Sequence, residues 1–451
     1  MQRSIRRTSM AAAVVLALAT ALTFATVSAA GATPPDLSTP AAINAYLVSI
    51  GVNPADAVWQ ETHKNYAGPG CPGAGWNCVP ATTPIVQVAD AGGTNLFACG
   101  GLDCVVVQVA LSGGQNGAGC LRGDNQSSNQ VQLCEITQAN AGNPNSTNAA
   151  AIAQNIQQSS GSTQTARQVA RITQDNTLGR NVAHIHQVIG QSQNAKNAVT
   201  ITQAQEAHQG ATVDQLTTEG DNSSSVTQRQ GQSQRATKAV TSITQDQNTT
   251  VGGDPLCDRP GDVAFDQAKN QCAEVAQNSN VLPPEGGSLD SSLRQLTNET
   301  QTASSSPLID QGQGFFNGGQ SGEKDQLSSG VATSEADQDT FQTQTATGVP
   351  ASGLIQTQTV GDPRCCQEQG TNSNDTADID QSTTQNASSP DAVQNAEFVG
   401  TCLTTGTCHV MQSSTIDGET NTNECTGSSC DEVFICTSGE GETFCFEGGV
   451  D

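Results

Sequence analysis

Three histidines are the side chains of this sequence best suited to hold a metal ion. His184 and His186 stand two residues apart, so in a strand both imidazoles point to one face, and His208 follows nearby. Imidazole nitrogens bind zinc and copper. Two ligands are too few to fix an ion, and no cysteine or carboxylate joins them at a defined spacing. We therefore expect a solvated face with no bound metal or other cofactor.

Arrangements typical of catalysis are missing from the sequence. Aspartate and glutamate number 43, but no pair has the spacing of a general acid and base. The motif that exposes a nucleophilic serine on a sharp turn is also absent. Some parallel β-helix proteins cleave glycans, but they usually bring aromatic side chains for stacking on sugars, and aromatics make up 3% of this chain. The sequence predicts that the protein is not an enzyme.

Cysteine is abundant and unevenly distributed. An even number of cysteines, 16, indicates disulfide bonds in an exported protein rather than a zinc site. Six lie near the start, six near the end and four between, and their expected role is structural. The candidates are Cys71, Cys78, Cys99, Cys104, Cys120, Cys134, Cys257, Cys272, Cys365, Cys366, Cys402, Cys408, Cys425, Cys430, Cys436 and Cys445. The sequence leaves their pairing open.

A seven-residue phrase that closes on glutamine returns eight times between Gln132 and Gln245. Most copies open with Asn or Gln, carry a small residue at the third position, and have Ile or Val two residues before the final glutamine. Repetition of this kind is typical of stacked supersecondary units. The closing residues are Gln138, Gln154, Gln174, Gln187, Gln203, Gln215, Gln228 and Gln245.

The phrase has the period of a β-strand, in which alternate positions share a face. In the copy at 197–203 that face carries Asn197, Val199, Ile201 and Gln203. Because these positions vary little between copies, we expect them to be buried, whereas the variable face should be exposed. The expected buried row is Ile172, Ile185, Ile201, Val213 and Val226, and the expected exposed set is Arg171, His184, Thr200, Thr212 and Ser225.

Buried glutamines need partners, because an unpaired buried amide costs about 1–3 kcal/mol. A side-chain amide has two donor protons and one acceptor oxygen. Stacked on an identical amide about 4.8 Å away, it can bond to the copies above and below. The sequence therefore predicts amide ladders along a stack of strands, in which each strand depends on its neighbours.

The phrase resembles the curlin repeat of curli-type amyloid fibre subunits, whose strands read Ser-x-Leu-x-Ile-x-Gln and Asn-x-Ala-x-x-x-Gln. Residues 148–154 and 181–187 follow the second form, and good copies cover about a quarter of the chain. The resemblance implies an all-β, irregular β-solenoid with Gln/Asn ladders and a tendency to self-association. The closing glutamines here are separated by 12 to 20 residues, which predicts long, polar and irregular turns.

Composition divides the chain into five regions. The basic start, apolar run and small-residue cleavage site of residues 1–29 are typical of a secretory signal peptide. A helix is expected just beyond Pro40, within the second region. The others are a Cys-containing N-terminal module (33–128), the Gln-rich repeat body (129–247), degenerate repeats and loops (248–395) and an acidic, Cys-rich C-terminal module (396–451). Small disulfide-stapled modules should thus flank the solenoid, with some segments disordered.

Charge limits the partners. Loss of the signal peptide removes three arginines, which leaves 14 basic and 43 acidic residues and a net charge of −29. Such a chain repels nucleic acid, and it has no second apolar run that would insert the mature chain into a membrane. The sequence predicts a secreted structural or adhesive protein of the cell surface or extracellular matrix, whose partners are matrix components or further copies. The alternative is a monomeric module that binds carbohydrate or another surface on a solenoid spacer.

Overall fold

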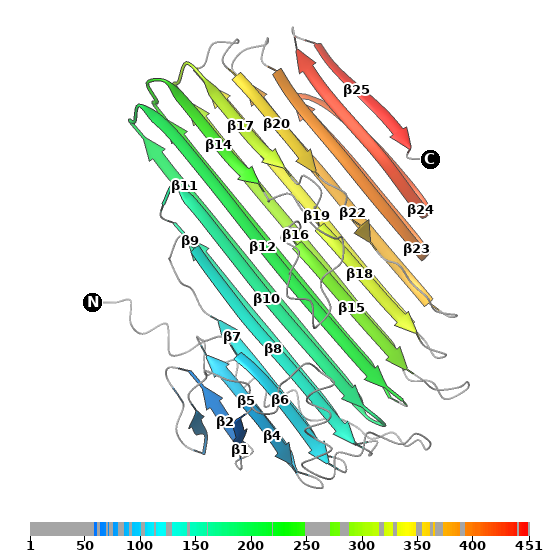
Figure 1. Ribbon diagram of the computed structural model, residues 1–451. Helices are drawn as coiled ribbons and strands as arrows, with labels where there is room; N and C mark the ends of the chain where they lie inside the picture. The colour runs from blue at the N-terminus through cyan, green and yellow to red at the C-terminus, as the bar shows by residue number, and fades with distance from the viewer. Residues whose placement is uncertain are drawn as a thin grey trace.

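A computed structural model shows the chain as a stack of mostly parallel strands (Figure 1). It describes the strands named below and many of the turns between them, from Val58 to Gly449. Residues 1–57, 249–270, 280–287 and shorter loop segments lie outside the described residues, so the expected signal peptide and N-terminal helix fall there. The described residues form strands and no helix, which confirms the predicted all-β fold.

The strands form two facing layers, and the chain alternates between them. The second layer contains β3 (Asn77–Val79), β2 (Lys64–Ala67), β5 (Thr94–Gly100), β7 (Gln115–Arg122), β9 (Thr147–Gln158), β11 (Arg180–Lys196), β13 (Asn222–Thr237), β16 (Leu289–Ser304), β19 (Ala332–Thr347) and β22 (Ser373–Ala387), each paired in parallel with the next. In the first coils one strand from each layer makes a coil, and this stacking confirms the predicted solenoid-like arrangement.

The first layer is continuous at its start and divided further on. It begins with β1 (Val58–Gln60), β4 (Ile85–Ala89), β6 (Cys104–Leu111), β8 (Asn129–Ala141), β10 (Thr163–Asn176) and β12 (Thr200–Thr217). β12 then pairs with two shorter strands, β14 (Ser242–Asn248) and β15 (Gln271–Ser279). Two further divided coils follow, β17 (Ile309–Gly314) with β18 (Gln320–Leu327) and β20 (Leu354–Val360) with β21 (Arg364–Cys365).

The strands lengthen along the stack, as Figure 1 shows from its blue end to its green centre. In the first layer β6 has 8 residues, β8 has 13 and β12 has 18. The uneven spacing of the glutamine phrase reflects this lengthening. The prediction of long irregular turns is therefore wrong in the repeat body: the polar tract after Gln187 continues strand β11, and residues 197–199 alone separate β11 from β12.

The core lies between the layers and is made of the predicted alternate positions. Ile172, Ile185, Ile201, Val213 and Val226 are all buried, as predicted. They do not form one row, however, because β12 carries two copies of the phrase. Val213 belongs to the main cluster with Ile172 and Ile185, whereas Ile201 packs in a second cluster with Ile243 and Ile309.

Three positions depart from the predicted alternation, and Arg171 and Ser225, which were expected to be exposed, are half-buried. Asn197 and Val199 were expected inside, but they lie in the turn before β12, where Asn197 has a φ of 57° and Val199 is 66% exposed. A chain that reverses between layers loses the two-residue period of a strand. Thr212 was expected outside but is buried. Its short side chain lies in register beside the longer Arg171, and β15 flanks it on the other side.

The C-terminal end closes the stack with antiparallel strands. β23 (Val393–Ile416) pairs with both layers and turns at Asp417 and Gly418 into β24 (Glu419–Gly439), which is followed by β25 (Glu442–Gly449). The φ values of 48° and 89° at the turn match the type I′ hairpin that Asp-Gly favours. Disulfides Cys425–Cys430 and Cys436–Cys445 lie here, and Cys408 is also disulfide-bonded.

Disulfides also fasten the N-terminal end, as the sequence predicted. They join Cys71 to Cys78, Cys99 to Cys104, and Cys120 to Cys134. No cysteine is free in the part of the chain that the structure describes. Because β6 pairs with β8 and β7 with β9, the stack passes without interruption from this disulfide-bonded end into the repeat body.

Candidate functional site

Buried glutamines run through the first layer as a hydrogen-bonded ladder. Its members are Gln87, Gln108, Gln138, Gln174, Gln215 and Gln277, one per coil. From Gln108 onwards, each amide nitrogen donates to the Oε1 of the previous glutamine, over 2.8 Å from Gln174 to Gln138 and 2.8 Å from Gln215 to Gln174. The six strands are thus joined by side chains as well as by backbone hydrogen bonds.

The second amide proton of a ladder glutamine crosses to the facing layer. Gln174 Nε2 donates to the carbonyl oxygen of Val182 over 2.9 Å, and Gln187 Nε2 donates to that of Gly210 over 3.0 Å. A buried amide therefore uses both protons, one along the stack and one between the layers. This double use explains why the core accepts glutamine where an ordinary core requires an aliphatic side chain.

Two further ladders contain the remaining glutamines singled out by the sequence. In the second layer, Gln228 donates to Gln187 and Gln187 to Gln154, each over 2.8 Å. In the part of the first layer where β12 pairs with β14, Gln245 donates to Gln203 over 2.8 Å. The eight predicted glutamines are all buried. They are distributed over three ladders, with Gln138, Gln174 and Gln215 in the first.

The structure also contains glutamine ladders beyond the eight predicted residues, together with the asparagine ladder that the resemblance implied. Gln191 donates to Gln158 over 2.7 Å, Gln234 donates to Gln193 over 3.1 Å, and asparagines at the opening of the phrase bond likewise, Asn148 donating to Asn181. The signal was present in the sequence, since Gln191 and Gln193 follow Gln187 at even spacing. It was missed because this polar tract looked like a turn.

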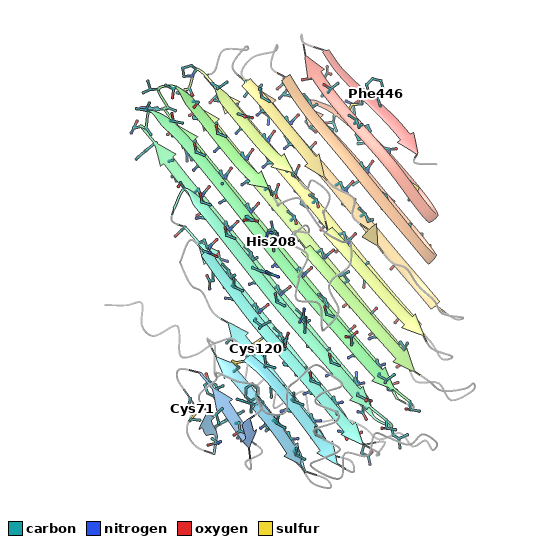
Figure 2. All side chains as sticks on the ribbon, in the orientation of Figure 1. Cys71, Cys120, His208 and Phe446 are labelled. Atoms are coloured by element: carbon teal, nitrogen blue, oxygen red, sulfur yellow. A yellow bond between two sulfur atoms is a disulfide. The ribbon has the colours of Figure 1, made fainter. Side chains whose placement is uncertain are left out.

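The three histidines do not meet. His184 and His186 lie exposed on the outward face of β11, as expected. Partial burial lowers the pKa of both rings, and the charges of Arg180 and Arg229 lower the pKa of His184 and His186 respectively. His208 lies on β12 in the other layer, with Nε2 3.1 Å from Glu206 Oε1 (Figure 2). These residues therefore do not form a common metal site.

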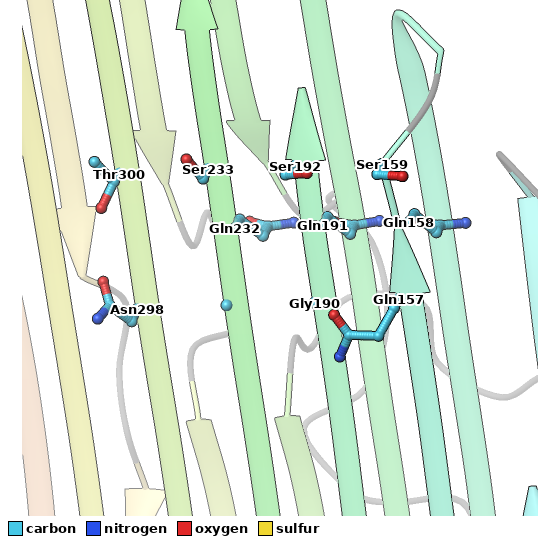
Figure 3. A pocket seen from close by; sticks show the side chains of 11 residues that line it. Gln157, Gln158, Ser159, Gly190, Gln191, Ser192, Gln232, Ser233, Asn298 and Thr300 are labelled. Atoms are coloured by element: carbon cyan, nitrogen blue, oxygen red, sulfur yellow. Dashed lines mark hydrogen bonds between the residues drawn. The ribbon is translucent and has the colours of Figure 1, made fainter. Parts of the chain in front are cut away.

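A groove of about 410 Å³ crosses the outward side of the second layer over β9, β11, β13 and β16 (Figure 3). Gly190 and Gly231 are in register on neighbouring strands and form its floor. A Cβ atom on Gly190 would collide with Oε1 of Gln157, whereas one on Gly231 would meet nothing within 4 Å. The missing side chain of Gly231 therefore leaves the hollow open, whereas the amide of Gln157 occupies the space above Gly190.

The groove is lined by uncharged polar groups. The amide of Gln157 lies at one end and that of Asn298 at the other, with Ser192, Ser233 and Thr300 along one side. Beyond Asn298, on the next strand, Phe341 is in register and 38% exposed. An extended neutral ligand could bond to the amides and hydroxyls and place an apolar face on the phenyl ring.

An acidic cluster with one histidine lies on the same side of the stack, nearer the C terminus. Arg294 Nε is 3.0 Å from Asp337 Oδ2, and His409 bridges Asp378 and Glu424, with Nδ1 2.9 Å from Asp378 Oδ1. These hydrogen bonds raise the pKa of His409 above its usual value. The cluster could not be found from the sequence, because its members come from five different strands.

Comparison with known proteins identifies no relative of this chain. No protein-family model, curated protein or solved structure matches this chain. Among the described residues, no helix has the length and apolar character needed to cross a membrane.

Proposed function

We propose that this is a secreted structural or adhesive protein of a cell surface or extracellular matrix, without catalysis of its own. The observation that supports this most is the set of amide ladders, which runs through the stack and uses the buried polar groups for cohesion. The resemblance of the repeat to curlin sequences points the same way. Disulfide bonds at both ends are typical of an oxidising compartment, and secretion itself rests on residues 1–29.

Fractionation of the cells that make the protein tests this proposal. An antibody raised against the folded chain should detect it in the washed surface or matrix fraction, lacking the first 29 residues. Cells without the protein should lose adhesion or matrix mass. Recovery of the whole chain inside the cell, or entirely as free protein in the medium with adhesion unchanged, would contradict the proposal.

The groove supports a second candidate, a module that binds a neutral polysaccharide. Its lining of amides and hydroxyls matches hydroxyl-rich ligands, and its length across four strands suits a linear chain. Gly231→Val should fill the hollow without strain, because no atom lies near the new Cβ. Titration calorimetry with a panel of neutral glycans should show binding by the unaltered chain and its loss in this variant.

Thr227→Val is the matched control for that experiment. Thr227 lies on the same face of β13, four residues before Gly231, and outside the groove lining. The control variant should bind as the unaltered chain does. Equal binding by all three proteins would remove the groove as the site.

A further inference from the structure

Four cysteines meet in the core at the narrow end of the stack, where Figure 2 labels Cys120. Cys99 of β5 is in register with Cys120 of β7 in the second layer. Cys104 of β6 is in register with Cys134 of β8 in the first layer. All four side chains are buried in the main hydrophobic cluster. Each layer therefore contributes two cysteines to the same part of the core.

The two disulfides made by these residues lie against each other. Cys99 is bonded to Cys104 and Cys120 to Cys134, so both bonds join one layer to the other. The Sγ atoms of Cys99, Cys104 and Cys120 all lie within 4.8 Å of one another. Cys134 Sγ is bonded to Cys120 Sγ and lies outside this group of three. Within the described residues, this is the one cluster of such ligands close enough to share an ion.

We propose that, once both disulfides are reduced, the four thiolates bind a single zinc ion or a similar thiophilic divalent cation. Zinc takes four thiolate ligands tetrahedrally at about 2.3 Å, which puts the sulfurs about 3.8 Å apart. The strands already hold three of them within 4.8 Å. Two ligands come from each layer, on neighbouring strands, so rotation of the side chains about χ1 has to bring the four sulfurs into a tetrahedron.

The exchange balances with a dithiol as the reductant. Each of two dithiol molecules gives two electrons and two protons to one protein disulfide and is itself oxidised to a cyclic disulfide. The four cysteine thiols then release four protons as they bind one divalent cation. The metal joins the same strand positions that the disulfides join after oxidation, so the first coils stay cross-linked whenever the chain is reduced.

Cobalt binding to the full-length chain tests the proposal. The folded protein is reduced with dithiothreitol under anaerobic conditions, freed of reductant and titrated with Co²⁺. It should bind one equivalent with the intense visible and near-ultraviolet bands of tetrahedral cobalt thiolate, and Zn²⁺ should abolish them. The oxidised chain should show no such bands. Absence of the bands in a reduced chain that keeps its β-sheet circular dichroism overturns the proposal.

Paired variants and alkylation locate the ion. Cys104→Ser/Cys134→Ser should lose the cobalt bands, whereas Cys425→Ser/Cys430→Ser, which removes a disulfide in β24, should keep them. Because the first variant could misfold, the unaltered reduced chain is also alkylated with iodoacetamide with and without Zn²⁺. Zinc should protect Cys99, Cys104, Cys120 and Cys134 but not Cys425. Equal modification of all cysteines with zinc present, or unchanged bands in Cys104→Ser/Cys134→Ser, overturns the assignment.

Discussion

A ladder glutamine makes hydrogen bonds in three directions. Gln187 donates to Gln154 and to the carbonyl of Gly210, and its own oxygen accepts from Gln228. Removing the amide therefore takes one hydrogen bond from each of three buried groups, which is more damaging than removing a contact from an ordinary core. Exposed polar residues on the outward face have water as a substitute.

Gln187→Leu should lower the free energy of unfolding by about 1–3 kcal/mol for each buried group left unpaired. Thr202→Leu, on the exposed face of β12, should change it by less than about 0.5 kcal/mol. Urea unfolding followed by circular dichroism measures both. Equal shifts of the two midpoints would show that the amide ladder contributes nothing to stability.

Asp339 should make stability depend on pH. Burial, the neighbouring charge and hydrogen bond of Asp337 and the charge of Asp380 raise its pKa from 3.8 to about 6, against the charge of Arg294. A raised carboxyl pKa means that the folded state binds the proton more tightly, so stability is highest below pH 3.8 and falls as the pH rises to about 6. Asp339→Asn should therefore raise the melting temperature above pH 6 and not below pH 3.8.

Asp310→Asn is the control for this effect, because Asp310 lies exposed on β17 in the other layer. Its melting temperature should follow that of the unaltered chain at every pH. A melting temperature of Asp339→Asn that also follows the unaltered chain throughout the range would contradict the assigned pKa.

The hairpin between β23 and β24 requires a left-handed backbone conformation at Gly418. A Cβ on Gly418 would meet no atom within 4 Å, but its φ of 89° disfavours any side chain. Gly418→Ala should therefore destabilise the chain by about 1–2 kcal/mol. Gly231→Ala is the matched control, since its Cβ also has open space and no positive φ is recorded there. Thermal unfolding of the two variants should separate them, and equal melting temperatures would contradict this account of the turn.

The pattern of the strands could be predicted from the sequence, but their lengths could not. The two-residue period and the recurrent Gln sufficed to predict stacked strands and buried amides, because both follow from local alternation. The number of residues per strand did not follow, because it depends on which neighbouring strand is available for pairing. Gln203 and Gln215 looked like two strands and lie on one, β12, since β10 and β14 support its two halves together. The groove likewise required register between Gly190 and Gly231, which the sequence does not contain.

The whole molecule has two different ends. The N-terminal end has short strands and three disulfides, and the C-terminal end has the antiparallel pair β24 and β25. Edge strands carry unpaired backbone groups that can template another chain. We expect the disulfides at one end and the antiparallel strands at the other to oppose such pairing with another chain. The net negative charge of the mature chain adds repulsion.

The intact, oxidised chain should therefore remain soluble, and removal of residues 33–128 and 396–451 should promote fibres by exposing the edges of the repeat body. High salt should also promote them by screening charge. Thioflavin fluorescence and negative-stain microscopy of intact and truncated chains, at low and high salt, measure this. If the intact oxidised chain forms fibres as fast as the truncated one, its ends do not act as caps.

The coils are narrowest at the N-terminal end, widest in the middle and narrower again near the C terminus, where Gln381 and Gln412 are 31 residues apart. Ladder partners are 21 residues apart between Gln87 and Gln108, 41 between Gln174 and Gln215 and 67 between Gln228 and Gln295. Loop-closure entropy grows with the logarithm of this separation, so the widest closure costs about 1 kcal/mol more than the narrowest. Each coil also needs the preceding coil as a template for its strands. We therefore expect the chain to close its least costly loop first, at the N-terminal end, and to fold from there into the repeat body.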